Sequence, residues 1–122
     1  MSLGEPSFTF GIEEEYHLVD RATRDLAPAP QLLMSACEAA LGGQVSPEFL
    51  RSQIEVGTRP VQRLSDARAE IVRLRSTIAR LAADHGLAPV AASTHPFGRT
   101  SRPPRIGGAV RKTRSSPSAS FP

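Results

Sequence analysis

The chain has 122 residues, which is enough for one domain at most, and its apolar content of 39% allows only a modest core. No apolar run is long enough to span a bilayer, the N-terminus lacks the pattern of a signal peptide, and the single cysteine, Cys37, cannot form an internal disulfide. These features argue against a membrane protein or a disulfide-stabilised secreted domain, and we expect a cytoplasmic protein with no membrane partner.

The net charge of +3 conceals two regions of opposite character. Residues 1–97 contain all twelve acidic residues and nine arginines, whereas residues 98–122 contain six basic residues and no acidic one. Residues 98–122 are also rich in proline, serine and glycine and have no apolar periodicity, so we expect them to be disordered. The basic charge of this tail therefore says nothing about the folded part of the chain.

The segment 8–20, FTFGIEEEYHLVD, is predicted to be a strand because aromatic and β-branched residues surround its acidic triplet. Successive strand residues point to opposite faces, so Glu13 and Glu15 share one face and Glu14 lies among apolar residues on the other. We expect Glu14 to lie near a sheet edge or to have a basic partner. An acidic triplet is also typical of solvated surface, and this alternative stays open beside a functional site.

A short hairpin return over residues 26–28 and a helix from residue 30 or 31 to residue 41 are predicted next. Pro28 and Pro30 end the pairing, because proline has no N–H for a ladder, and Gly42 and Gly43 stop the helix. Cys37 is interpreted as a small buried hydrophobe rather than a nucleophile. The expected apolar stripe of this helix consists of Leu32, Leu33, Cys37, Ala40 and Leu41.

A second strand is predicted over residues 49–56, with Ile54 and Val56 on one face and Glu55 on the other. An amphipathic helix follows from the N-cap Ser65 to a stop at Gly86, and its arginines at 68, 73, 75 and 80 are interpreted as a solvated face. Its expected apolar stripe consists of Ala67, Ile71, Leu74, Ile78 and Leu81. A last strand, 87–94, is weakened by Pro89, so we expect it to lie at an edge or to begin late.

This order of elements predicts an α+β fold with both helices on one face of a sheet and a polar opposite face. Glu13, Glu15 and Glu55, together with His95, are candidates for that polar face, and we expect the three carboxylates to lie within common reach of one or two ions. Oxygen ligands select magnesium or manganese over softer metals. His17 and His85 are interpreted as structural or surface histidines, whereas both roles stay open for His95, which ends a strand.

Four motifs in order resemble the opening of the type 2 glutamate-cysteine ligase family, also called carboxylate-amine ligases. They are FGIEEEYHLVD at 10–20, QIEVGTRPV at 53–61, ADHGL at 83–87 and APVAASTHPF at 88–97. GIEEEY together with THPF is specific, whereas either alone is weak. The resemblance covers roughly residues 8–97 and implies a glutamine-synthetase-like fold, in which a curved, mostly antiparallel sheet holds divalent metals and ATP on its concave face.

The chemistry implied by the resemblance is ATP-dependent amide formation in glutathione biosynthesis. The γ-carboxylate of glutamate attacks the γ-phosphate of ATP, and an amine such as that of cysteine displaces phosphate from the resulting acyl phosphate. By position in the motifs, the resemblance implies that Glu13, Glu15 and Glu55 bind Mg²⁺ or Mn²⁺, with Glu14 turned away. It also implies that Thr94 and His95 bind substrate, with His95 at the substrate or metal end of the site.

The chain departs from the family after Phe97. Family members continue with a long catalytic region that carries paired histidines and basic residues, and residues 98–122 do not resemble it. We therefore divide the chain into the N-terminal part of a ligase domain, residues 1–97, and a basic tail, residues 98–122, that is a frameshift product or the end of a truncated gene. On this view the chain alone is an inactive fragment without a nucleic-acid partner. The alternative is a small non-catalytic module whose tail binds nucleic acid through phosphate contacts.

Overall fold

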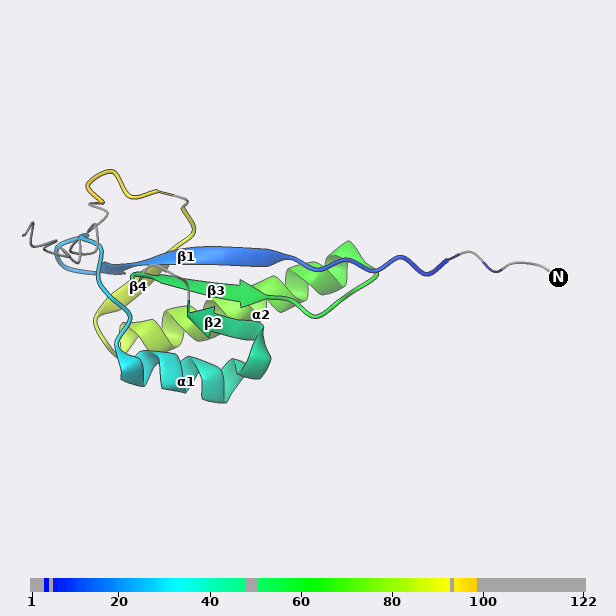
Figure 1. Cartoon of the computed structure of the whole chain (residues 1–122), viewed down its shortest axis with the longest axis horizontal. Coiled ribbons are helices and arrows are strands. Elements are labelled where there is room, and N and C mark those ends of the chain that lie inside the picture. Colours follow the sequence, from blue (N-terminus) through cyan, green and yellow to red (C-terminus); the bar gives the residue numbers. More distant parts are fainter. Residues whose placement is uncertain (1–3, 5, 48–50, 93, 99–122) are drawn as a thin grey trace, which may run out of the picture.

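A computed structural model describes residues 4, 6–47, 51–92 and 94–98 of the chain (Figure 1). Its elements are β1 (Glu13–Asp20), α1 (Gln31–Leu41), the 3-10 helix η1 (Gly42–Gln44), β2 (Val45–Pro47), β3 (Gln53–Gly57), α2 (Leu64–Ala83) and β4 (Leu87–Val90). The tail predicted to be disordered lies, apart from Gly98, outside the described residues.

The four strands form one sheet in the order β2-β3-β1-β4, and every neighbouring pair is antiparallel. This arrangement confirms the predicted α+β class with an antiparallel sheet. Strand β4 lies at one edge, where Pro89 stands opposite Leu18, so the missing N–H of the proline is accommodated as the sequence predicted.

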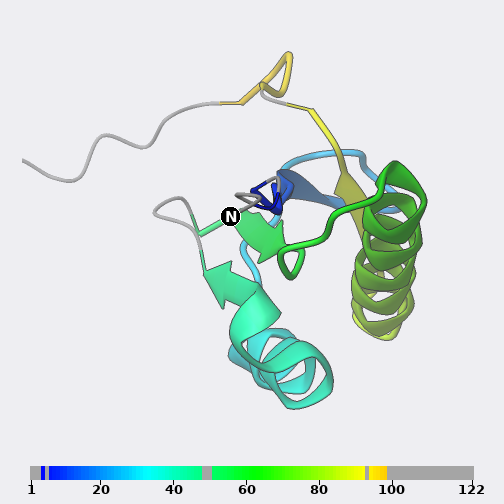
Figure 2. The same cartoon turned by 90° about the vertical axis from the view of Figure 1, so that its right-hand side faces the viewer.

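Both helices pack on the same face of the sheet (Figure 2). The core lies between that face and the helices, and its largest fully buried members are Leu18, Leu33, Cys37, Ile54, Val56, Leu74 and Ile78. Of the predicted stripe of α2, Ala67, Leu74 and Ile78 are buried, and Ala82 joins them. Ile71 and Leu81 are half-buried against the core. Within the described residues, no helix is long and apolar enough to cross a membrane.

Cys37 has no exposed surface, which confirms its prediction as a buried hydrophobe. Burial raises the pKa of its thiol, with a smaller contribution from the neighbouring charge of Glu38. The thiol is therefore kept neutral, and the reactive thiolate form is disfavoured.

Strand β1 begins at Glu13 rather than at residue 8. The backbone N–H of Ile12 donates to the hydroxyl of Thr58 at 2.9 Å instead of to a strand carbonyl, so the regular ladder with β3 stops there. Beyond this point Phe10 makes only an isolated bridge with Val61. The prediction of a strand from Phe8 was therefore too long.

The start of α2 and the buried face of α1 also differ from the prediction. Helix α2 begins at Leu64 with Arg63 as its N-cap, and no side chain caps it, so the assignment of Ser65 as N-cap was wrong. In α1 the buried residues are Leu33, Met34, Cys37 and Leu41, whereas two predicted stripe residues, Leu32 at 76% and Ala40, are exposed. With 3.6 residues per turn, the buried residues lie on one side of the helix, and Leu32 lies on the opposite side.

Strands β2 and β4 show the limits of local patterns. Strand β2 was not predicted, because it has only three residues and ends at Pro47. Strand β4 ends at Val90 rather than at Thr94, since the N–H of Ala92 donates to the carbonyl of Val90 at 2.9 Å and turns the chain away from β1. Strand β3 begins at Gln53, and part of the predicted strand 49–56 lies outside the described residues.

A polar cluster joins η1, α2 and β3 beside the sheet. The side-chain amide of Gln44 donates to the carbonyl of Gly57 at 3.1 Å and to the carboxylate of Glu70 at 2.9 Å. Arg73 donates to Glu70 from Nε at 3.1 Å. The hydrogen bond from Arg73, followed by that from Gln44, lowers the pKa of Glu70 to about 2.

The core position of Leu74 yields a test of the packing. Leu74→Ala should lower the free energy of unfolding by about 2 to 5 kcal/mol, because it removes buried methyl groups and leaves a cavity. Leu32→Ala is the matched control and should change stability by less than about 0.5 kcal/mol, because Leu32 is exposed. Urea unfolding of the three proteins measures both differences, and equal losses would contradict the packing.

The lowered pKa of Glu70 predicts a pH dependence of stability. Because its folded value of about 2 lies below its ordinary value of 4.5, the ionised group stabilises the fold above pH 4.5, and this contribution is lost as the pH falls toward 2. Glu70→Gln should cost about 1 kcal/mol or less at pH 7, since the ion pair with Arg73 is partly exposed. Urea unfolding at several pH values should show the difference from wild type shrinking below pH 4.5. A difference that stays constant would count against this assignment.

Candidate functional site

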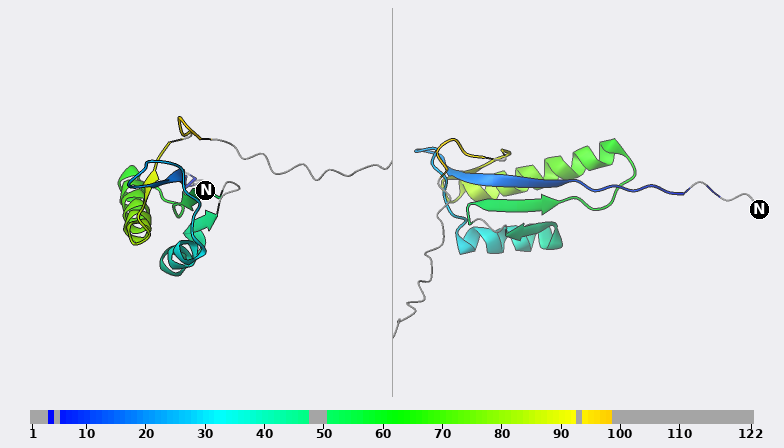
Figure 3. Two further views of the ribbon diagram at one scale, coloured as in Figure 1. Left: turned by 90° about the vertical axis from the view of Figure 1, so that its left-hand side faces the viewer. Right: turned by 45° about the horizontal axis from the view of Figure 1, so that its top comes forward.

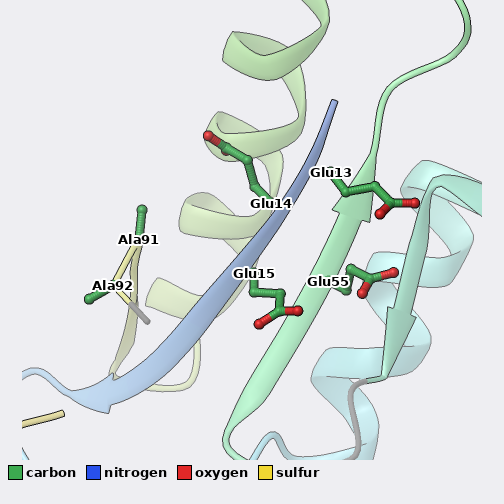
Figure 4. A pocket seen from close by; sticks show the side chains of 6 residues that line it. All are labelled: Glu13, Glu14, Glu15, Glu55, Ala91 and Ala92. Carbon is green, nitrogen blue, oxygen red and sulfur yellow. The ribbon is translucent and has the colours of Figure 1, made fainter. Parts of the chain in front are cut away.

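The face of the sheet opposite the helices carries the predicted carboxylates. Glu15 stands directly opposite Glu55 across the β1–β3 pair, and Glu13 stands opposite Gly57 one row away. Ser46 extends the row onto β2, where its hydroxyl donates to Glu55 at 3.4 Å. The structure therefore brings the three predicted residues onto one face, as the pleat argument required (Figure 4).

An open hollow of about 440 Å³ lies over this row. On one side it is lined by Glu13, Glu14 and Glu15 of β1 and by Glu55 of β3. On the other side it is lined by Ala91 and Ala92. These small residues follow β4, and residues 91–92 and 94–98 lie on the side of the sheet away from the helices (Figures 2 and 3). The hollow is open to solvent, so a charged ligand can enter it without crossing the core.

Glu14 projects away from the other carboxylates and toward α2 (Figure 4). Arg75 of α2 donates from Nε to Oε2 of Glu14 at 2.8 Å and from Nη2 to Oε1, and the buried hydroxyl of Tyr16 also donates to Oε2. The prediction that Glu14 has a basic partner is confirmed.

These contacts shift the protonation equilibria of Glu14 and Tyr16 in opposite directions. The hydrogen bond from Arg75 lowers the pKa of Glu14. Burial, followed by the hydrogen bond to Glu14, raises the pKa of Tyr16. At neutral pH the pair therefore consists of a carboxylate and a neutral phenol that donates to it.

The donor chemistry of the acidic face fits a hard cation, because carboxylate and hydroxyl oxygens are the ligands that Mg²⁺ and Mn²⁺ prefer. In the part of the chain that the structure describes, however, no group of three or more His, Cys, Asp or Glu side chains is arranged to hold a metal ion. The expectation that Glu13, Glu15 and Glu55 already converge is therefore not met. Their backbone positions share a face, but their exposed or half-buried side chains extend along it.

His95 is held by backbone groups of two segments. Its Nδ1 accepts the N–H of Phe97 at 3.2 Å, so its proton lies on Nε2, which donates to the carbonyl of Arg24 at 2.9 Å. Arg24 has a φ of 68° in the tight turn after β1. His95 thereby fastens the segment after β4 to the turn after β1, and Thr94 beside it is exposed. Neither residue lines the hollow, and their predicted role in substrate binding stays a prediction.

The other two histidines agree with structural and surface roles. His17 continues the polar face along β1, but it is buried, and its Nε2 lies 3.5 Å from Nε2 of Gln53 on the neighbouring strand. His85 is exposed after the end of α2.

Sequence reasoning missed several contributors to the site. Ser46 lies on a strand too short to recognise, and Ala91 and Ala92 were included in a strand that ends before them. Arg75 was assigned to a solvated face. The signal that could have found Arg75 was the unmatched charge of Glu14, which required a cation from the helix that covers its face.

The hydrogen bond from the N–H of Phe97 to His95 predicts that this amide is protected from hydrogen exchange. His95→Ala should speed amide exchange of Phe97 by about 2- to 10-fold, the effect of losing one partly exposed hydrogen bond. His85→Ala is the matched control and should leave Phe97 unchanged. Hydrogen exchange followed by NMR measures both, and unchanged exchange in His95→Ala would contradict the fastening role.

Comparison of the sequence with known proteins places the chain in a family of ligases. The model of glutamate-cysteine ligase family 2 (GCS2) matches residues 9–112. The chain belongs to this family. The match extends beyond Phe97, and whether the tail is a frameshift product stays a hypothesis.

Three curated relatives bear provisional names as glutamate–cysteine ligase 2. The protein of Ruegeria pomeroyi is 56% identical over 93 residues, which cover 76% of this chain and 24% of the relative. The protein of Paracoccus denitrificans is 47% identical over 120 residues (88% and 32%), and that of Chloroflexus aurantiacus is 54% identical over 91 residues (75% and 23%). The chain thus spans about a quarter to a third of the length of these relatives.

Proposed function

We propose that this chain forms the metal-binding wall of an ATP-dependent glutamate–cysteine ligase. The observation that supports the proposal best is the register of β1 on β3, which sets Glu15 directly opposite Glu55 and places Glu13 on the same face. Like charges directly opposite each other repel across a sheet pair, and a cation bound between Glu15 and Glu55 would offset that repulsion. The family assignment supplies the reaction class in which that cation has a use.

In this proposal Glu13, Glu15 and Glu55 hold Mg²⁺ or Mn²⁺, which supplies neutralisation of the phosphate charge that develops during phosphoryl transfer. A change of side-chain rotamer brings the carboxylates together, because their positions on adjacent strands already share a face. The hydroxyl of Ser46 donates to one oxygen of Glu55 at 3.4 Å and helps to orient that carboxylate on the face.

The proposed reaction joins glutamate and cysteine in two steps. A γ-carboxylate oxygen of glutamate attacks the γ-phosphorus of ATP and ADP leaves. The amine nitrogen of cysteine then attacks the acyl carbon of the resulting acyl phosphate. Phosphate leaves, and the product is γ-glutamylcysteine. The wall contributes position and charge rather than an acid or base of its own, because binding two reactants in the correct orientation accounts for much of the rate of such transfers.

The segment after β4 forms the proposed substrate end of the site. Ala91 and Ala92 line the hollow without filling it, which leaves room for a ligand over the carboxylates. Thr94 offers an exposed hydroxyl. His95 acts in this proposal by fastening the segment to the turn after β1, since both ring nitrogens already contact backbone groups.

The open, antiparallel sheet with both helices on one face is also what a glutamine-synthetase-like architecture requires. We include that fold, with ATP on the uncovered face, in the proposal. The acidic character of the uncovered face means that ATP would bind there together with the cation, because the phosphates alone would be repelled.

Metal binding by the chain tests the proposal. We expect Mn²⁺, followed by its EPR signal, to bind the 122-residue protein, and Glu15→Gln and Glu55→Gln each to weaken binding at least about tenfold, because each removes a charged ligand. ATP should strengthen the binding of Mn²⁺ in the wild-type chain. Glu38→Gln, on the exposed side of α1, is the matched control for loss of one negative charge and should leave the affinity nearly unchanged.

Two outcomes would contradict this proposal. The first is a wild-type chain that does not bind Mn²⁺ with or without ATP. The second is binding that Glu15→Gln and Glu38→Gln weaken to the same extent, which would show a response to net charge rather than to a site.

A further inference from the structure

The outward carboxylates of β1 depend on the register of that strand. A slip of one residue in the pairing of a strand moves every side chain to the opposite face. For Glu13, Glu14 and Glu15, a slip would exchange two outward carboxylates for one. Burial of Tyr16 and Leu18 already favours the register in which two carboxylates are outward, and the contacts of Glu14 on the same covered face add to this preference.

The contact with α2 has the geometry for this selection. The guanidinium of Arg75 engages both oxygens of Glu14, and the hydroxyl of Tyr16 engages one of them as well. The side chain of Glu14 is only 19% exposed. A two-point contact between a planar guanidinium and a carboxylate defines orientation as well as distance, which a single point charge does not.

The position of Glu14 links this contact to the site. It stands opposite Val56 on β3, and Glu55 lies next to Val56 on the other side of the sheet. Glu13 and Glu15 are the immediate neighbours of Glu14 along β1. Holding Glu14 on the helix side therefore holds the neighbouring carboxylates of both strands on the open side.

We propose that Arg75, acting through Glu14, is a positioning residue that sets the affinity of the acidic face for its cation. This inference rests on the proposed function, because it takes Glu13, Glu15 and Glu55 as the ligands. Arg75 touches none of these three carboxylates in the contacts described above, so its effect passes through the orientation of β1.

Arg75 also affects the affinity for a cation through its own positive charge. This charge effect can be separated from the positioning effect. Removing a positive charge near a cation site should by itself strengthen cation binding, on the order of twofold for a solvated charge. Loss of positioning should weaken it. The two effects have opposite signs, so the direction of the change discriminates between them.

The test uses Mn²⁺ titration of the full chain, monitored by EPR, with a set of variants. Arg75→Gln and Glu14→Gln should each weaken Mn²⁺ binding about tenfold. The double variant, which has the same net charge as wild type, should also lose about tenfold rather than a hundredfold, because both changes remove one interaction. Arg75→Lys keeps the charge without the two-point contact and should be intermediate. Arg80→Gln, an exposed arginine on the same helix, is the charge control and should stay within about twofold.

A second measurement separates positioning from loss of the fold. Circular dichroism and thermal unfolding identify variants that stay folded, and NMR contacts between Glu15 and Glu55 report the register of β1 on β3. If Arg75→Gln does not fold, the comparison of Arg75→Lys with wild type decides. Folded variants with wild-type affinity overturn the inference and leave the proposed function intact. A wild-type chain whose Mn²⁺ binding does not depend on Glu15 overturns both.

Discussion

The alternation of side chains along β1 is the constraint on which the rest of this structure depends. Because the strand lies between a helix-covered face and an open face, every second residue must be apolar or paired, and the others can be charged. Tyr16 and Leu18 satisfy this rule by burial, and Glu14 satisfies it by its contact with Arg75. The open face is then left to Glu13 and Glu15.

Neighbouring strands extend this division across the sheet. The β1–β3 register places Ile54 and Val56 in the core and Glu55 beside Glu15. The same face changes character along β1, from exposed carboxylates at its start to the buried His17 further on. The acidic face is therefore confined to one end of the sheet, and the segment after β4 forms its other border.

Family membership and geometry contribute different parts of the functional argument. The comparisons establish a ligase family over most of the chain, whereas the relatives are three to four times longer than the matched part. The structure contributes the placement of the carboxylates and the contact of Glu14 with Arg75 of α2. The proposed wall needs groups that bind nucleotide and amino acid opposite to it, because carboxylates and a cation alone do not orient three substrates.

The sequence by itself determined the α+β class, the two helices and the shared face of the three glutamates. These features follow from local periodicity, from glycine and proline positions and from the two-residue repeat of a strand. It left two explanations for Glu14, a position near a sheet edge or a basic partner. Only the tertiary structure decided which one, because Arg75 is 61 residues away and looks like any other exposed arginine of an amphipathic helix. The same reason explains the errors at Ser65, Leu32 and β2: a cap, a buried helix face and a short edge strand depend on contacts with distant segments, which local patterns do not contain.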